Sequence, residues 1–180
     1  MLARYDRLLS SRPLVTKVTT ATAISVCTDI GLQRFTSHQP HTHDVHRTVR
    51  QATWSGPIMA TMLHHWMNVL ATIPSWGPLP APIVRLAVDT FTLMPFSHVL
   101  YIGYLSTAEH RSPDRVASDL REKLGPLLRA GYATIPPVML VNLWVIPLRF
   151  RVLFLNLVLG VGYGAFLNWR VNRREAGSSE

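Results

Sequence analysis

The sequence predicts an all-α membrane protein, a bundle of four to five hydrophobic helices with an amphipathic interfacial helix. Of the 180 residues, 48% are hydrophobic and only 16% are charged, whereas a soluble domain has about 25% charged residues. The charges also leave long gaps, because no Asp, Glu, Lys or Arg occurs in the ranges 51–84, 90–108, 130–148 and 152–169. About 20 mostly apolar residues cross a bilayer, so each gap can hold a membrane span. A buried core in a soluble helical protein is the alternative, but these gaps leave little polar surface to keep the chain dissolved.

We expect a single membrane-embedded domain over residues 1–180, and its first element is an interfacial segment over residues 1–12. This segment carries three arginines and one acid, and it ends at Arg12-Pro13. An arginine-rich start is typical of mitochondrial presequences, and we expect this one to stay uncleaved. The chain ends in Gly-Ser-Ser-Glu, which is not a peroxisomal address. Both ends therefore favour mitochondria.

Three hydrophobic segments follow, over residues 13–35, 52–73 and 83–108. The loop at 74–82 holds four prolines in nine residues, so it cannot be helical throughout, and its Trp76 suits the headgroup level of a membrane. The one cysteine, Cys27, excludes an intrachain disulfide, and we expect it to be a small core residue.

An amphipathic connector is expected over residues 109–130, with Ser112-Pro113 near its helix start. Two apolar segments follow, over residues 132–146 and 148–169, and Pro147 separates them. Arg149 and Arg151 lie at this break and are expected at lipid headgroups or at a pore mouth, because arginine at membrane depth is costly. Whether the two segments count as one broken helix stays open, and so does the side on which each terminus lies.

Polar residues form one stripe on each of several expected helices. At about 100° per residue, Asp29 shares a face with Thr22, Ser25 and Gln33. We assign the following as pore-lining or intramembrane polar residues: Asp29, Gln33, His65, Asn68, Asp89 and Asn142. Facing stripes can line a water-filled lumen, or they can hold a dry bundle together by interhelical hydrogen bonds. Both interpretations remain open on the residues alone.

Two further groups have local explanations. Arg85 and Asp89 are one turn apart and can pair within their own helix. Histidines 38, 41, 43 and 46 have spacings that can hold Zn²⁺ or Cu²⁺, but no cysteine lies near them. A solvated loop is the better interpretation, so no metal and no other cofactor is expected.

The function classes that the sequence disfavours are enzymes and nucleic-acid binders. The chain lacks the Gly-x-Ser-x-Gly, phosphate-loop and His-Glu-x-x-His signatures. Its net charge of +8 comes from basic residues at the ends of apolar runs. That distribution fits anionic lipid headgroups such as those of cardiolipin better than DNA.

Several short patterns occur in an order that resembles the Mpv17/PMP22 family, small integral proteins of the mitochondrial inner membrane and of peroxisomes. The C-terminal pattern is Asn142-Leu-Trp-Val-Ile-Pro147-Leu-Arg149-Phe-Arg151, followed by Tyr163 to Trp169. The earlier matching positions are Tyr5, Leu8, Pro13, Thr20, Asp29, Gln33, Arg47, Arg50, Gly56, Pro57, His64, Trp66, Asp89 and Pro95. Three departures are Thr90 for glutamine, Tyr163-Gly164 for Trp-Asn, and a longer stretch between Gly-Pro and His-x-Trp.

The resemblance implies a non-selective channel of modest conductance. We therefore expect a channel-like conduit for small solutes or ions, in the mitochondrial inner membrane first and the peroxisomal membrane second. The alternative is a non-catalytic accessory subunit that binds lipid and packs against a larger inner-membrane complex of the respiratory type. A conduit would be a monomer or a small homo-oligomer, whereas an accessory subunit would have fixed partners. A membrane-bound enzyme is a weaker third reading for want of a site.

Overall fold

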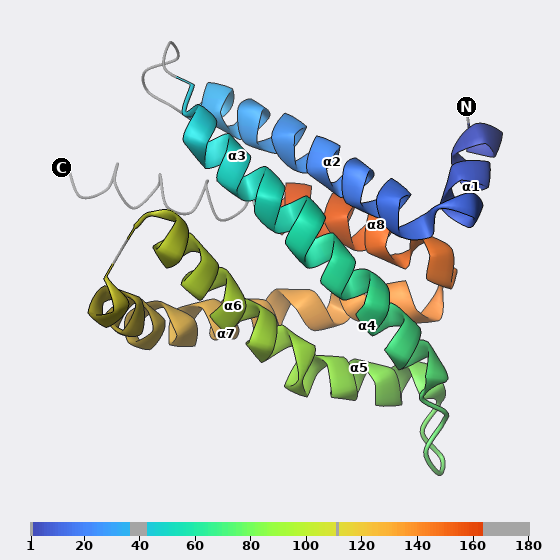
Figure 1. Cartoon of the computed structure of the whole chain (residues 1–180). Coiled ribbons are helices and arrows are strands. Elements are labelled where there is room, and N and C mark those ends of the chain that lie inside the picture. The colour runs from blue at the N-terminus through green and yellow to red at the C-terminus, as the bar shows by residue number, and fades with distance from the viewer. Residues whose placement is uncertain (1, 37–42, 111, 164–180) are drawn as a thin grey trace. The chain divides into compact units, whose positions relative to one another are not determined.

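A computed structural model describes residues 2–36, 43–110 and 112–163 (Figure 1). The described residues form helices, turns and loops but no β-strand. An isolated bridge joins Trp76 to Leu79. The predicted all-α class is therefore confirmed. Within the same residues, one helical stretch, Ala81–Ala108, is long and apolar enough to cross a membrane by length and composition. The expected set of four to five such helices is not confirmed.

The chain forms two compact units. Unit 1 comprises Met1–His64 and Val152–Glu180, and unit 2 comprises His65–Arg151. Each unit is described by itself.

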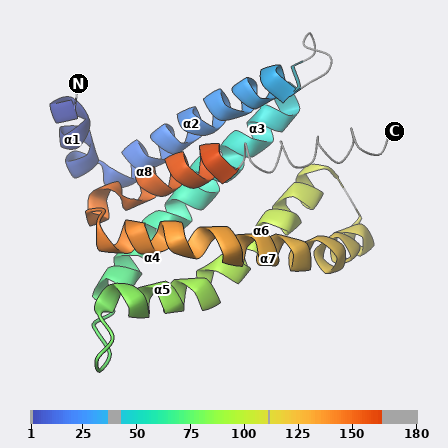
Figure 2. The same ribbon diagram turned by 180° about the vertical axis from the view of Figure 1, so that it is seen from behind.

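Unit 1 is built around α2 (Pro13–Thr36), which agrees with the first predicted segment. The short helix α1 (Leu2–Ser11) precedes it, and the Tyr5 hydroxyl lies 3.3 Å from Thr20 Oγ1. α2 packs beside α3 (Val45–Thr53) and the π-helix η1 (Trp54–Ala60) (Figure 1). Figure 2 shows that the segment formed by α8 (Arg151–Leu155) and the π-helix η3 (Asn156–Tyr163) runs along α2.

The helix that carries the second predicted segment is longer than expected and widens in its middle. α3, η1 and α4 (Thr61–Thr72) follow one another without a break. Pro57 lies inside η1. Proline has no N–H to donate to the carbonyl four residues earlier, and π-turns are one way in which a helix absorbs such a gap.

Unit 2 contains α5 (Ala81–Phe91), α6 (Leu93–Ala108) and α7 (Pro113–Trp144) in addition to the end of α4. α6 and α5 both pack against α7 (Figure 2). The short 3₁₀-helix η2 (Leu148–Phe150) follows α7. The loop before α5 turns at Gly77, whose φ of +57° favours glycine. Trp76, in the same loop, is 78% exposed, as a headgroup anchor requires.

The third predicted segment is divided into two helices at Thr92. Pro95 cannot donate a backbone hydrogen bond to Phe91, so α5 ends there and α6 begins anew at Leu93. The predicted proline-led start at Ser112-Pro113 is confirmed, because Ser112 Oγ accepts a hydrogen bond from the Arg115 N–H. The connector and the fourth predicted segment, in contrast, are one helix, α7, with no break between them.

Candidate functional site

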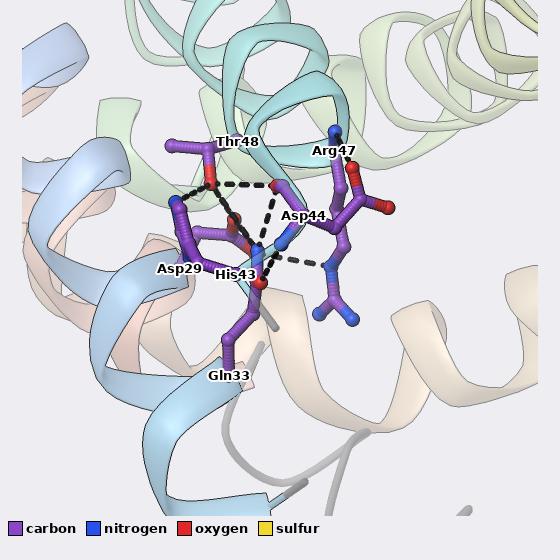
Figure 3. Close-up of polar contacts among 6 residues, drawn as sticks. All are labelled: Asp29, Gln33, His43, Asp44, Arg47 and Thr48. Atoms are coloured by element: carbon purple, nitrogen blue, oxygen red, sulfur yellow. Dashed lines mark hydrogen bonds and ion pairs between the residues drawn. The ribbon is translucent and has the colours of Figure 1, made fainter. Parts of the chain in front are cut away.

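The most extensive polar cluster joins α2 to the start of α3 in unit 1. We call it the Asp29 cluster; its members are Asp29, Gln33, His43, Asp44, Arg47 and Thr48 (Figure 3). Asp29 is 5% exposed, and its carboxylate accepts three hydrogen bonds. The donors are Thr48 Oγ1 at 2.6 Å, Gln33 Nε2 at 2.7 Å and Arg47 Nε at 3.1 Å. The Arg47 contact is also an ion pair.

Asp44 positions the donors of this cluster. Its carboxylate accepts the Arg47 backbone N–H at 2.9 Å and so caps the N-terminus of α3. Gln33 holds the Asp44 backbone from α2, with Oε1 accepting from Asp44 N at 2.8 Å. The hydrogen bond from Arg47 and the nearby charges of Arg50 and His46 hold the pKa of Asp44 below its ordinary value. Sequence position alone had placed Asp29 and Gln33 on one face; the structure adds the helix that faces them.

The Asp29 face of α2 also contains a close helix approach. A Cβ added to Gly56 in η1 would lie 1.9 Å from Thr22 Oγ1 and 3.1 Å from the Val18 carbonyl. Thr22 itself donates to Val18 O at 2.9 Å, which keeps its hydroxyl close to its own helix. Only glycine fits at this contact.

A buried lysine in unit 1 was not predicted. Lys17 is 6% exposed, and its Nζ donates to His64 Nδ1 at 3.1 Å. The signal that could have found it is its helical spacing, one face with Thr20 and Thr16.

In unit 2, Asp89 pairs with a tryptophan rather than with the arginine one turn before it. Asp89 is 4% exposed, and its Oδ1 accepts from Trp66 Nε1 at 2.7 Å. Arg85 donates instead to two backbone carbonyls, those of Ile73 and Ala71, both at 2.9 Å. The predicted ion pair within α5 is therefore wrong, because the C-terminal carbonyls of α4 offer Arg85 acceptors that have no helical donor.

Asn142 lies near the C-terminal end of α7, and Arg151 is the first residue of α8. Asn142 is fully buried; its Nδ2 lies 3.8 Å from Met139 Sδ, and its Oδ1 has no partner among the described residues. Arg151 is 8% exposed and donates to Leu143 O and Ile146 O, both at 3.0 Å. Arg149 is exposed and lies over the Phe150 ring at 4.9 Å.

A second buried carboxylate, Asp119, joins α6 to α7. It is 1% exposed, and its partners are Ser106 Oγ at 3.0 Å and Lys123 Nζ at 2.8 Å. The sequence analysis had assigned this stretch to an amphipathic surface helix and did not single out Asp119. The predicted connector forms the polar first half of α7, and this half also has a face that packs against α6.

His65 and Asn68 differ from the other predicted site residues, because both are exposed on α4. The opposite side of α4 buries Leu63, Met67 and Leu70. Cys27 is likewise exposed, on α2, so its expected place in a core is wrong.

Nothing in the described residues groups three potential metal ligands of the His, Cys, Asp and Glu types. His38 and His41 of the histidine-rich stretch lie outside the described residues. His43 Nε2 lies 3.2 Å from Thr48 Oγ1, within the Asp29 cluster.

Comparison with known proteins gives the family. The profile of the Mpv17 / PMP22 family matches residues 106–168. Peroxisomal membrane protein 2 of Bos taurus is 30% identical over 164 residues, which cover 87% of this chain and 83% of the bovine protein. The chain belongs to the Mpv17/PMP22 family.

Two other relatives differ in how much they share. An uncharacterised protein of Schizosaccharomyces pombe is 33% identical over 116 residues, 64% of this chain and 52% of that protein, so the chain spans about half of its length. The mitochondrial inner membrane protein Mpv17 of Caenorhabditis briggsae is 25% identical over 162 residues, 88% of this chain and 86% of the relative. No solved structure matches the chain. The predicted location, the mitochondrial inner membrane with the peroxisomal membrane second, agrees with these relatives and is confirmed.

Several of the positions that carry the Mpv17/PMP22 resemblance are partners of one another in the structure. Tyr5 meets Thr20, and Trp66 meets Asp89. Asp29, Gln33 and Arg47 belong to one cluster. The family pattern in this chain is therefore a pattern of contacts between helices.

Proposed function

We propose that this member of the Mpv17/PMP22 family is a channel-like conduit for small solutes or ions in an organelle membrane. The observation that carries the proposal is the exposed polar face of α4, formed by His65, Asn68 and Thr72. Polar side chains in a membrane-embedded helix avoid lipid and face water or protein. Asp29, Asp89 and Asp119 are buried within their own units, whereas this face of α4 is exposed, so α4 is the best candidate for the lining.

His65 is exposed on α4 and gives this lining a polar side chain. Asn68, one turn later on the same face, offers both a donor and an acceptor to a passing hydrated solute. Neither residue forms part of the packed side of α4, so both can be changed without opening the core.

The test is solute efflux from liposomes that contain the purified chain, followed by single-channel recording. We expect leakage above that of protein-free liposomes, and Asn68→Leu should lower it roughly twofold or more by making the lining apolar. Val69→Leu is the matched control, because Val69 is the exposed neighbour of Asn68 on α4. Equal leakage with and without the protein would contradict the conduit; an unchanged Asn68→Leu variant would remove α4 as the lining.

The second candidate is a non-catalytic accessory subunit, and one observation favours it. The intramembrane acids Asp29 and Asp89 contact neighbouring helices, as residues do when they hold a dry bundle together. In that case the exposed face of α4 would contact another protein.

Blue-native electrophoresis of mildly solubilised membranes, with mass spectrometry of the band, distinguishes the two candidates. A small band that contains only this chain supports the conduit. A large band with fixed stoichiometric partners supports the accessory subunit.

A further inference from the structure

α5 holds one side of α4 at two places within unit 2. Trp66 Nε1 on α4 donates to Asp89 Oδ1 at 2.7 Å. At the C-terminal end of the same helix, Arg85 donates to the carbonyls of Ala71 and Ile73, both at 2.9 Å. Because α4 is held at both ends of its part in unit 2, the side that these contacts do not cover is presented by a fixed helix.

That other side of α4 carries three uncharged polar groups. His65, Asn68 and Thr72 are all exposed, and at about 100° per residue they fall within about 60° of one another. They extend along about 10 Å of the helix at about 1.5 Å per residue. Thr72 Oγ1 donates to Val69 O at 2.7 Å, which leaves the hydroxyl oxygen as an acceptor. Asn68 offers both a donor and an acceptor.

Val69 gives these polar groups an apolar edge. It is 52% exposed and lies about 40° from His65 around the helix. We call His65, Asn68, Val69 and Thr72 the α4 surface. A solute on this surface meets hydrogen-bonding groups on one side and hydrocarbon on the other. A polyol matches both, because its hydroxyl groups can form hydrogen bonds while its carbon chain contacts the valine.

The α4 surface has no acidic or basic side chain other than the imidazole. Residues 51–84 contain no Asp, Glu, Lys or Arg. The two charged residues of α5, Arg85 and Asp89, have opposite signs, so their formal charges sum to zero. An ion that leaves water at the α4 surface therefore meets no net fixed charge to offset its lost hydration. An uncharged solute loses only hydrogen bonds, which Asn68 and Thr72 can replace.

We infer that the solutes of the conduit are small uncharged polyols, and that Asn68 and Thr72 select them over ions by hydrogen bonding. This assignment rests on the proposed conduit and names its solute class. Asn68 determines the specificity, because a charge at its position would attract ions of the opposite sign to the α4 surface. Val69 supplies the apolar contact for the carbon chain.

The experiment measures tracer exchange into liposomes that contain the purified full chain, with erythritol, rubidium and chloride as tracers. Each unlabelled solute is equal on both sides, so no membrane potential builds up, and at about pH 8 free imidazole groups are neutral. Above the rates of protein-free liposomes, we expect erythritol to enter about tenfold faster than either ion. If no tracer enters faster than in protein-free liposomes, the conduit and the inference both fail. If the ions enter as fast as erythritol, the conduit stands and the inference is overturned.

The variant Asn68→Asp adds a negative charge to the α4 surface with almost no change in size. We expect the entry of rubidium to rise about fivefold or more, and that of chloride not to rise. Ala117→Asp is the matched control, because it adds one exposed negative charge to α7. It should leave all three rates unchanged. An unchanged rubidium rate in Asn68→Asp overturns the assignment, and so does an equal rise in Ala117→Asp.

The variant Thr72→Val removes one hydroxyl from the α4 surface and keeps the shape of the side chain. We expect the erythritol rate to fall about two- to fivefold, as the loss of one hydrogen bond implies, and the ion rates to stay. Thr107→Val on α6 is the matched control, since Thr107 is also exposed and donates to a carbonyl of its own helix. Equal erythritol rates in the two variants would overturn the part of Thr72 in selection. The wild-type comparison decides the solute class even if a variant does not fold.

Discussion

Asp29 brings a carboxylate into the contact between α2 and α3, where three side-chain donors surround it. Hydrogen bonds from these donors offset part of the hydration free energy that the carboxylate loses on burial. Asp89 likewise contacts Trp66, and Asp119 contacts Ser106 and Lys123. At the residue scale, the acids of this chain act first as contacts between helices.

A double-mutant cycle tests this role for Asp29. We expect Asp29→Asn and Arg47→Gln to share a coupling free energy of about 1–2 kcal/mol, reduced from that of a fully buried pair because Arg47 is partly solvated. The side chain of Arg47 is 39% exposed and that of Asp29 is 6% exposed. The measurement is the free energy of unfolding in mixed micelles.

The control for the cycle is Cys27→Ala, on the exposed face of the same helix. It should change the free energy of unfolding by less than about 0.5 kcal/mol. Additive effects of the two cluster variants would show that the ion pair contributes nothing beyond its separate hydrogen bonds.

Residue-scale prediction from sequence succeeded where one helix face was enough. Helical spacing placed Asp29 with Gln33, and these two lie in one cluster. It could not identify the facing partners Arg47 and Thr48, because periodicity within a helix contains no information about its neighbour. Asp119 was missed for the same reason, since its partner Ser106 lies on α6.

At the scale of elements, glycine decides how closely two helices approach. Gly56 of η1 meets Thr22 of α2 with no space for a methyl group, and Gly131 of α7 meets Met94 and His98 of α6. Other glycines, such as Gly103, have open space around them. Small residues of this kind allow membrane helices to pack closely.

We expect Gly56→Ala to lower the free energy of unfolding by about 1–3 kcal/mol, because α2 and η1 must move apart. Gly103→Ala, on α6, is the matched control and should be neutral or stabilising by up to about 1 kcal/mol, since alanine favours a helix. Thermal unfolding of both variants in the same detergent measures the difference. Equal effects would mean that the Thr22 contact does not limit the approach.

Two element boundaries followed from prolines in the sequence. α2 begins at Pro13 and α7 at Pro113, as predicted. The division at Thr92 was not predicted, although Pro95 was a visible signal for it. The union of the connector with the fourth segment was missed because a change in composition was taken for a change in structure.

For the whole molecule, the predicted number of membrane spans is not confirmed. Gaps in charge predicted four spans, but only Ala81–Ala108 meets the length and composition criteria in the part that the structure describes. The segment at 52–73 includes His64, His65 and Asn68, which lower its hydropathy although none is counted as charged. Absence of charge is therefore a weaker indicator of a span than apolar composition.

Labelling of Cys27 tests whether α2 is embedded. The chain has one cysteine, and it is exposed in the middle of α2. If that face contacts lipid, a membrane-impermeant maleimide cannot reach the thiol and should not label it in membranes opened to both faces. The control is Ser75→Cys in a Cys27→Ser background, which places the thiol in the exposed loop and should be labelled. Ready labelling of Cys27 would place this face of α2 in water.

The length of α7 determines how a displacement at one end of unit 2 reaches the other end. Its 32 residues make a rod of about 48 Å at 1.5 Å per residue, whereas the hydrocarbon layer is about 30 Å thick. A helix of that length cannot lie wholly in the hydrocarbon if it runs across it. Its charged first half, with the exposed Lys123, is the part suited to water. The end of α7 that contains Asn142 and the carbonyls bound by Arg151 is then part of the same helix as a solvent-facing end. We expect a ligand that displaces the aqueous end of α7 to shift its buried end as well.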